Sequence, residues 1–339
     1  MKRQPRRGNS GKSKRSVPSE DQIIEKLRRV GSLRDRAAGL RLGIGDDAAL
    51  FSPRAGFETV LTCDWFLEGT HFLRDKHPAD AIGWKCLARV VSDVAAMGGT
   101  PRCFLLSLAV PATYTGRWLD DFLSGLRRAQ NRLGCVLAGG DTTKSNRILI
   151  QVTVIGEVLS GKAVLRSGTR PGDAIFVSGR LGEAELGLRL LQSQKRIDPV
   201  DSHLRKHLYP EPRLHLGSWL AANKLATAMM DLSDGLSTDL ARLCAASRVG
   251  ASIEAARLPL PTRAGKRVSL SELALHGGDD YELLFTVSPK KLRRIPQHLG
   301  SLPLTRIGTI TASQAVRIVD AASRQRSLKR NGWDPFRQR

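Results

Sequence analysis

The chain has 339 residues, of which 41% are hydrophobic and 25% charged, and its net charge is +22. This length and composition are typical of a globular protein with room for two domains and exclude a largely disordered chain. No apolar run reaches the roughly 18 residues that a membrane-spanning helix needs, so we expect no membrane association. The five cysteines are dispersed and never form a C-x-x-C pair, which argues against a disulfide framework or a zinc site and predicts a cytoplasmic protein with reduced thiols.

Much of the positive charge lies at the two ends of the chain. Residues 1–19 are rich in Lys, Arg, Gly and Ser and are predicted to form a basic disordered tail. Such a tail can act as a nucleic-acid arm or as a solubilising extension. The absence of aromatic residues from positions 1–17 favours the second interpretation, and we expect no specific nucleic-acid partner.

Apolar periodicity predicts alternating helices and strands in a first domain, residues 20–160. A glycine-flexed turn, Gly43 to Leu50, carries the adjacent carboxylates Asp46 and Asp47 ahead of the first clear strand. The predicted helices are 21–30, 78–97 and 118–133, and the predicted strands are 57–63, 104–110, 135–138 and 148–159.

A turn-rich segment, 162–172, marks the predicted boundary to a second domain, residues 161–339. A polar, proline-broken connection is predicted up to Pro212. The predicted helices are 183–192, 214–225 and 236–246, and the predicted strands are 174–178, 226–230, 282–287 and 316–320. The fold class is therefore α/β (α+β), with two α/β domains of similar size.

Three aspartates follow apolar strands at their carboxyl ends, where α/β sheets usually present ligand-binding groups: Asp64, Asp141 and Asp231. Each also has a purely structural interpretation. An aspartate after Gly-Gly is a common turn residue, and Asp231 could cap the helix that begins near Leu236.

Asp93 is a stronger candidate because it lies within the apolar stripe of the helix predicted at 78–97. A carboxylate there costs several kcal/mol unless it is paired or binds a metal ion. Arg89 and Arg102 are candidates for structural pairing. However, carboxylate-bearing turns without interleaved His or Cys suit Mg²⁺, which binds through a few carboxylates and the phosphates of a substrate. Mg²⁺ with a nucleotide is the predicted ligand.

The common phosphate-binding motifs are missing. Gly11-Lys12-Ser13 lacks the first glycine of a P-loop, and the chain has neither a protein-kinase signature nor a G-x-G-x-x-G turn. A different set of eight motifs occurs in order along the chain: Gly43 to Ala49, Glu68 to Phe72, Ser92 to Gly98, Gly139 to Thr143, Leu165 to Gly168, Asp231 to Leu236, Gly277 to Leu283 and Gly332 to Asp334.

This combination, which covers about residues 20 to 336, closely resembles the thiamine-monophosphate kinase family. The resemblance implies the aminoimidazole ribonucleotide synthetase-like fold, with two α/β domains and with N-terminal domains that pair in a homodimer. It also implies the reaction, in which ATP gives its γ-phosphoryl group to thiamine monophosphate and produces thiamine diphosphate and ADP.

The resemblance further implies roles for single residues. Those at the Mg²⁺ sites would be Asp47, Thr62, Cys63, Asp64, Asp93, Asp141, Asp231 and Asp234. Those that contact ATP would be Gly140, Asp141, Arg166 and Ser233, and those that contact thiamine monophosphate would be His71, Asp279 and Trp333.

Three residues depart from the family pattern. Cys63 stands where many members have Thr, which leaves a backbone carbonyl as the ligand for a hard metal ion there. Asp279 replaces a more usual Glu and is one methylene shorter, and Pro335 replaces a common His.

The acceptor of the implied reaction is a phosphate oxygen already ionised near pH 7, so no residue is assigned as a general base. His71 is expected to hold the acceptor, the alternative being a satisfied core histidine. Trp333 is expected to stack on the acceptor, the alternative being that it caps the core together with Phe336. Two other functions stay open: a related ATP-using enzyme such as a selenophosphate synthetase, and a basic nucleic-acid-binding protein.

Overall fold

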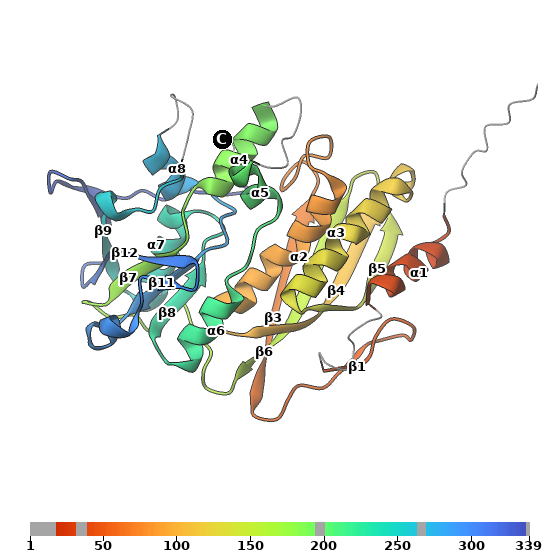
Figure 1. Cartoon of the computed structure of the whole chain (residues 1–339), viewed down its shortest axis with the longest axis horizontal. Coiled ribbons are helices and arrows are strands. Elements are labelled where there is room, and N and C mark those ends of the chain that lie inside the picture. The colour runs from red at the N-terminus through yellow and green to blue at the C-terminus, as the bar shows by residue number, and fades with distance from the viewer. Residues whose placement is uncertain (1–17, 32–38, 194–200, 263–268, 337–339) are drawn as a thin grey trace, which may run out of the picture.

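The computed structural model describes residues 18–31, 39–193, 201–262 and 269–336 (Figure 1). The predicted basic tail, residues 1–19, lies outside these ranges except for Pro18 and Ser19. The described part begins with helix α1 (Glu20–Gly31), which matches the helix predicted at 21–30, and with the short antiparallel pair β1 (Leu40–Leu42) and β2 (Leu50–Phe51).

Four strands form a first sheet, which we call the N-terminal sheet, in the order β3-β6-β4-β5. Its strands are β3 (Phe57–Leu67), β4 (Thr100–Val110), β5 (Val136–Lys144) and β6 (Leu149–Leu159). Only β4 and β5 are parallel neighbours, since β6 runs antiparallel to both β3 and β4. Helices α2 (Ala79–Ala96) and α3 (Arg117–Leu133) cover one face of this sheet (Figure 1).

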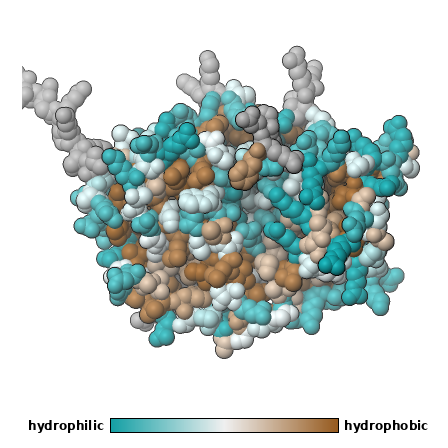
Figure 2. Space-filling model, turned by 180° about the vertical axis from the view of Figure 1, so that it is seen from behind, coloured by the Kyte–Doolittle hydropathy of each residue, from teal (hydrophilic) through white to brown (hydrophobic). Residues whose placement is uncertain are grey.

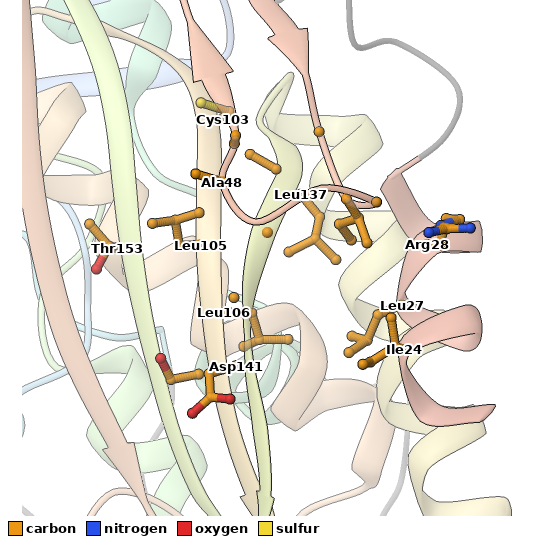
Figure 3. Close-up of a pocket in the computed structure, with 18 of the residues that line it drawn as sticks. Ile24, Leu27, Arg28, Ala48, Cys103, Leu105, Leu106, Leu137, Asp141 and Thr153 are labelled. Carbon is orange, nitrogen blue, oxygen red and sulfur yellow. The ribbon is translucent and has the colours of Figure 1, made fainter. Parts of the chain in front are cut away.

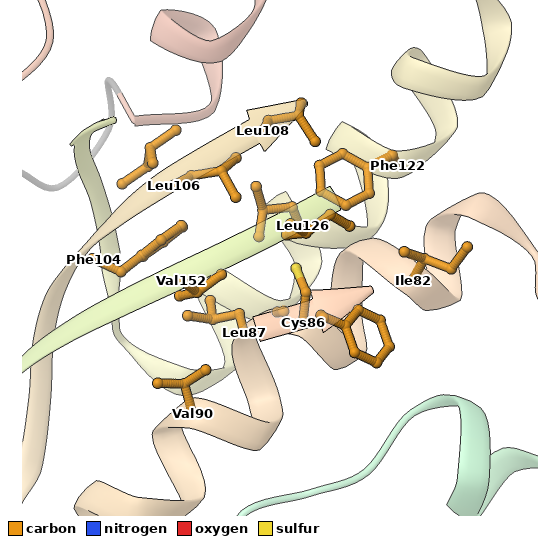
Figure 4. Packing of buried hydrophobic residues seen from close by; sticks show 14 of the residues in the cluster. Ile82, Cys86, Leu87, Val90, Phe104, Leu106, Leu108, Phe122, Leu126 and Val152 are labelled. Carbon is orange, nitrogen blue, oxygen red and sulfur yellow. The ribbon is translucent and has the colours of Figure 1, made fainter. Parts of the chain in front are cut away.

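The core between helices and sheet follows from the alternation of apolar side chains. Phe104, Leu106 and Leu108 of β4 point toward α2 and α3, where they meet Ile82 and Phe122, and all five side chains are at most 2% exposed (Figure 4). The opposite side of the N-terminal sheet, which carries Leu61, Cys63 and Trp65 of β3, is covered by neither helix. We call this side the open face.

A second sheet, which we call the C-terminal sheet, has eight strands, with β11 paired to β12 outside the main order β14-β13-β9-β12-β7-β10-β8. The strands are β7 (Ala174–Ser178), β8 (Ala226–Asp231), β9 (Gly250–Glu254), β10 (Leu283–Val287), β11 (His298–Leu299), β12 (Leu302–Thr311), β13 (Val316–Val319) and β14 (Gln325–Ser327). The helices that follow the first sheet are α4 (Glu183–Ser193), α5 (Ser202–Leu208), α6 (Leu214–Ala222), α7 (Leu236–Ser247) and α8 (Leu270–His276). Alternate residues of the central strands pack in two apolar clusters, one with α7 and α8 and the other with α6.

The predicted fold class, α/β (α+β), is confirmed, but several elements differ from their predicted bounds. Strand β3 continues to Leu67, so Asp64 lies inside the strand and not at its end. Strand β5 likewise runs through Gly139-Gly140-Asp141 to Lys144. The glycine pair produces an irregularity in the pairing with β4, not a turn: Gly140 has φ +151°, and a Cβ there would lie 1.9 Å from the carbonyl oxygen of Leu106.

Other elements were missed altogether. Helix α5 lies in the segment predicted to be a connection, and Asp201 caps it by accepting hydrogen bonds from the backbone N–H groups of His203 and Leu204. Strands β9 and β12 and helix α8 are also absent from the prediction, and most neighbouring strands are antiparallel where an α/β pattern favours parallel ones. Within the described residues, no helix is both long and apolar enough to cross a membrane.

Helix α2 joins the two sheets, since it packs on the N-terminal sheet and also against α5, α6 and β8. Its last turn approaches α6 so closely that a Cβ on Gly217 would lie 2.0 Å from the carbonyl oxygen of Ala95. The region where α2 meets α5, α6 and β8 is called the junction below.

Candidate active site

Helix α2 presents a line of charged side chains at the junction. Lys85, Arg89 and Asp93 are spaced four residues apart and therefore lie on one side of the helix. Each meets a polar group from another element: Lys85 pairs with Asp279 at 2.8 Å, Arg89 lies 3.4 Å from Asp64, and Asp93 accepts a hydrogen bond from Thr62.

Asp64 and Thr62 of β3 point toward α2, because alternate residues of a strand share a face. The Thr62 hydroxyl donates to Oδ2 of Asp93 at 2.6 Å. Burial raises the pKa of Asp64, and so do the charges of Asp93 and Asp234, while Arg89 opposes the shift. Burial also raises the pKa of Asp93. Asp64 therefore lies close enough to Asp93 and to Asp234 to be repelled by each of them.

Asp231, the last residue of β8, is 3% exposed. Burial and then the charge of Asp93 raise its pKa to about 8, and Arg166 partly opposes this shift. Arg166 acts in the same sense on Asp93. The junction thus holds a pair of carboxyl groups, the half-buried Asp93 of α2 and the buried Asp231 of β8, with the guanidinium of Arg166 nearby.

The loop after β8 excludes the capping interpretation of Asp231. Helix α7 begins at Leu236 after the N-cap residue Gly235, which provides no side-chain cap, and the backbone N–H groups of Asp234 and Gly235 donate instead to Asp239. Asp234 itself forms an ion pair with Arg242. Similarly, Asp141 lies within a strand and is not a turn residue, and Arg102 pairs with Glu157 at 2.9 Å, not with Asp93.

The three residues predicted to contact thiamine monophosphate, His71, Asp279 and Trp333, lie around the same junction. The Asp279 backbone N–H donates to the Ser233 carbonyl, and that of Trp333 donates to the Asp234 carbonyl. Trp333 packs beside Gly278, the neighbour of Asp279, since a Cβ on that glycine would lie 3.7 Å from the Cβ of Trp333. The core-cap alternative does not hold for Phe336, which is 96% exposed.

His71 is half-buried near Arg89 and Asp279. Its Nδ1 accepts a hydrogen bond from the backbone N–H of Leu67 at 3.0 Å, which leaves the proton of the neutral ring on Nε2. Burial, with the charge of Arg89 second, lowers the pKa of His71 to about 4. The ring is therefore neutral at pH 7 and can donate through Nε2.

A second group of predicted residues lies on the open face. Asp47, Gly140 and Asp141 line a cavity of about 710 Å³ between α1, the glycine-flexed turn and the N-terminal sheet, whose floor includes Leu105 and Thr153 (Figure 3). The strand register explains why Asp141 and Asp64 are separated. Asp141 shares a cross-sheet row with Trp65, one row beyond Asp64, so the two carboxylates point to opposite faces.

Cys63 also lies on the open face, where its Sγ is 3.1 Å from the side-chain nitrogen of Gln151. The thiol thus points away from Thr62 and Asp64, and the side chain of Cys63 is not available to the junction. The structure therefore divides the predicted metal-binding and ATP-binding residues into two groups. The junction group is Thr62, Asp64, Asp93, Arg166, Asp231, Ser233 and Asp234, and the open-face group is Asp47, Gly140 and Asp141.

The donor set of the junction group fits Mg²⁺. Among the described residues, no three His, Cys, Asp or Glu side chains converge as a ready-made metal site. Yet Asp93 and Asp231 are two hard oxygen ligands whose mutual repulsion a divalent cation would relieve. The Nε atom of Arg89 is buried without a hydrogen-bond partner, since its 3.4 Å approach to Asp64 lacks hydrogen-bond geometry, and a phosphate oxygen would satisfy it.

Sequence reasoning missed Lys85 and His207, and it considered Arg89 only as a partner for Asp93. The spacing of Lys85, Arg89 and Asp93 along α2 is the signal that could have found two of them. No comparable signal exists for His207, because its partners Lys85 and His77 are more than 120 residues away in the sequence.

Comparison with known proteins identifies this architecture. The family models described as "AIR synthase related protein, N-terminal domain" and "AIR synthase related protein, C-terminal domain" match residues 45–158 and 170–321. The hydrogenase maturation protein HypE is 19% identical with a TM-score of 0.74, and this likeness shows the fold alone. The chain therefore has the fold of the AIR synthase-related proteins.

More similar relatives define the family within this fold. Thiamine-monophosphate kinase of Bacillus subtilis (strain 168) is 35% identical over 87% of this chain and 94% of the relative. A crystal structure of thiamine-monophosphate kinase from Stenotrophomonas maltophilia K279a is 37% identical, with a TM-score of 0.78 over 87% of this chain and 95% of that one. A structure described as "AaThiL complexed with AMPPCP and TMP" is 32% identical, with a TM-score of 0.74 over 90% of this chain and 97% of that one. The chain belongs to the thiamine-monophosphate kinase family.

Proposed function

We propose that this protein transfers the γ-phosphoryl group of ATP to the phosphate of thiamine monophosphate, as a step in thiamine diphosphate biosynthesis. One bond forms between an acceptor phosphate oxygen and the γ-phosphorus, and the bond from that phosphorus to the β,γ-bridging oxygen breaks. The products are thiamine diphosphate and ADP. The observation that carries the proposal is the junction, where the carboxyl pair Asp93 and Asp231 lies near the proposed thiamine-phosphate contacts His71, Asp279 and Trp333.

The residues of the site account for this reaction by positioning and charge. Asp64, Asp93 and Asp231 would hold Mg²⁺, with Thr62 and Asp234 beside them. Asp47, Asp141 and the Cys63 carbonyl are the further proposed ligands. When bound, Mg²⁺ supplies positive charge that neutralises the phosphate oxygens during transfer.

Phosphate and nucleotide binding fall to both groups of residues. Arg166 lies near Asp93 and Asp231, and it can contact phosphate oxygens bidentately. Ser233 follows β8 in the same loop as Asp234, while Gly140 and Asp141 are the proposed ATP contacts on the open face. No proton needs to leave the acceptor oxygen, so the site requires no general base.

Recognition of the acceptor is assigned to three side chains. Neutral His71 donates a hydrogen bond through Nε2, which suits a phosphate oxygen. Trp333 offers an indole face to the cationic thiazolium or the pyrimidine ring. Asp279 offers carboxylate oxygens to the amino group of the pyrimidine.

We also propose that the protein is a homodimer paired through the open face. On the same side of β3, Leu61 is 69% exposed and Trp65 is 55% exposed. Large apolar side chains that gather on an exposed surface often mark a protein–protein interface. Figure 2, which views the molecule from behind, shows hydrophobic residues gathered over the half that contains the N-terminal sheet. A second copy covering this face would also enclose the cavity beside Asp141.

The proposed domains are residues 20–160, for ATP and Mg²⁺ binding and for dimerisation, and residues 161–339. The separate N-terminal and C-terminal sheets support this division. We propose a cytoplasmic location, supported by the five cysteines, all of which are free.

The test is incubation of the full chain with ATP, Mg²⁺ and thiamine monophosphate, with the products identified by mass. Thiamine diphosphate and ADP should appear in equal amounts, and EDTA should abolish both. Thiamine is the matched control acceptor because it has the same rings without the phosphate. Hydrolysis of ATP without thiamine diphosphate would contradict the proposal.

A further inference from the structure

Lys85 is a fully buried lysine at the junction, with 1% of its surface exposed. Its neighbours on the same turns of α2, Ala81, Cys86 and Ala88, are apolar and completely or almost completely buried. An ammonium in such a place costs several kcal/mol unless it is paired and hydrogen-bonded. Its carboxylate partner is Asp279, 2.8 Å away, whose side chain stays 31% exposed.

A second contact of Lys85, with His207, determines which nitrogen of the His207 ring carries the proton. Its Nζ lies 3.3 Å from Nδ1 of His207, and Nε2 of His207 lies 3.1 Å from Nε2 of His77. An ammonium has only donors, so Nδ1 of His207 must accept and Nε2 must carry the ring proton. That proton faces Nε2 of His77, which can accept it when the proton of His77 lies on Nδ1, 3.2 Å from the Leu73 carbonyl oxygen. The backbone of Ala184 is a further hydrogen-bond partner of the His207 ring.

The reverse arrangement is excluded while Lys85 is charged. If Nδ1 of His77 accepted from the Leu73 backbone, its Nε2 would donate to His207, and the remaining proton of His207 would face the ammonium. Both imidazoles are neutral, because burial, followed by the charge of Lys85, lowers the pKa of His77 to about 4 and that of His207 well below its usual value. Lys85 is thus held by two groups that lie beside each other, since Nδ1 of His207 is itself 4.0 Å from Oδ2 of Asp279.

Asp279 is held from other directions as well. Its Oδ1 accepts from the Tyr281 hydroxyl at 2.7 Å, and its backbone N–H donates to Ser233. The backbone φ angles of Asp279 and Tyr281 are positive, +66° and +50°, and residues other than glycine rarely adopt such values. A carboxylate can accept about four hydrogen bonds, and Lys85 and Tyr281 use two, which leaves two acceptor positions on the exposed side.

We propose that Lys85 is a positioning residue for the acceptor: held by His207, it fixes the Asp279 carboxylate so that its remaining acceptor positions bind the amino group of an aminopyrimidine ring. This inference rests on the proposed function. Lys85 comes from α2 and Asp279 from the segment between α8 and β10, so the pocket for the acceptor ring is complete only when the two sheets are packed together at the junction.

The inference is tested by steady-state kinetics on Lys85→Met, Asp279→Asn and the double variant, with ATP, Mg²⁺ and thiamine monophosphate. Lys85→Met should raise the KM for thiamine monophosphate about tenfold, which corresponds to about 1.4 kcal/mol, while kcat and the KM for ATP change less than about twofold. Asp279→Asn should have the same signature. Because Lys85 acts through Asp279, the double variant should be no worse than Asp279→Asn alone.

Lys290→Met, which removes an exposed lysine far along the chain, is the matched control and should behave like the wild type. If Lys85→Met fails to fold because Asp279 is left unpaired, the double variant still decides, since it removes both charges. The inference is overturned if the KM for thiamine monophosphate keeps its wild-type value in Lys85→Met or in the double variant. It is also overturned if the increase in this KM in the double variant equals the product of the increases in the two single variants. If the wild type makes no thiamine diphosphate, it is the proposed function that fails.

Discussion

The carboxyl group of Asp231 is buried next to that of Asp93, so the stability of the protein should depend on pH. The pKa of Asp231 in the folded chain is raised to about 8, above the value of about 4 in an unfolded chain. Below pH about 4, Asp231 is protonated in both the folded and the unfolded chain, and its contribution to stability is fully present. Between pH about 4 and 8 the unfolded chain ionises more readily, so the free energy of unfolding falls as pH rises.

We therefore expect Asp231→Asn to stabilise the metal-free protein, increasingly so as pH rises. In EDTA, the difference in Tm between Asp231→Asn and the wild type should widen from pH 5 to pH 8, as measured by differential scanning fluorimetry. Asp121→Asn, which changes an aspartate 54% exposed on α3, is the matched control and should show no such widening. A constant difference for Asp231→Asn would contradict the account of this pair. With Mg²⁺ and both substrates, the same variant should lose turnover, because a ligand charge is gone.

Trp333 is distinguished from its neighbour Phe336 by what it contacts. Trp333→Ala should raise the KM for thiamine monophosphate about tenfold, as expected for a loss near 1.4 kcal/mol of stacking and cation–π attraction, with the KM for ATP unchanged. Phe336→Ala is the control and should alter neither constant, because Phe336 is 96% exposed. A lower Tm with an unchanged acceptor KM in Trp333→Ala would show that the indole supports the fold and not the acceptor.

At the scale of elements, the helices were more predictable than the strands. The helix predicted at 78–97 is α2 (Ala79–Ala96), because its apolar residues recur at helical spacing and are fully buried. Strand β5 was cut short because Gly-Gly-Asp signals a turn, whereas in the fold it continues as an irregular strand beside β4. Of the site, the cost of burying Asp93 could be recognised from the sequence. Its Asp231 partner could not, since the packing of the two sheets decides which carboxylates meet.

The contact between α2 and α6 offers a test at this scale. Alanine is a better helix former than glycine by about 0.8–1 kcal/mol, but a Cβ at Gly217 would lie 2.0 Å from the backbone oxygen of Ala95. Overpacking of this kind costs about 1–3 kcal/mol, so Gly217→Ala should lower the Tm by a few degrees in spite of its helix propensity. His215→Ala, at an exposed position of the same helix, is the control and should leave the Tm unchanged. An unchanged or higher Tm for Gly217→Ala would mean that the helices separate without cost.

At the scale of the whole molecule, the two faces of the N-terminal sheet have different surroundings. One face meets α2 and the junction, where Asp64 and Asp93 lie, and the other carries Asp141 beside exposed apolar residues. From the sequence, Asp64 and Asp141 were both predicted at strand ends, but the face of the sheet on which each lies could not be assigned. A shift of one residue in register exchanges the two sides of a strand. The proposed site includes residues on both faces, so we expect the open face to be enclosed in the active protein.

The homodimer is the arrangement that we expect to enclose it. In light scattering coupled to size exclusion, the wild type should have twice the 37.0 kDa mass of the chain. Leu61→Glu places a charge on the open face, on the edge strand β3, where Leu61 is 69% exposed. It should shift the protein to the mass of one chain because an unpaired charge is costly in an apolar interface. Ser124→Glu puts the same charge on the exposed side of α3 and should remain a dimer. Turnover should fall with the dimer in Leu61→Glu, since Asp47 and Asp141 lie on the face that is uncovered. A wild-type protein with the mass of one chain at micromolar concentration, and full activity, would rule out the open face as a dimer interface.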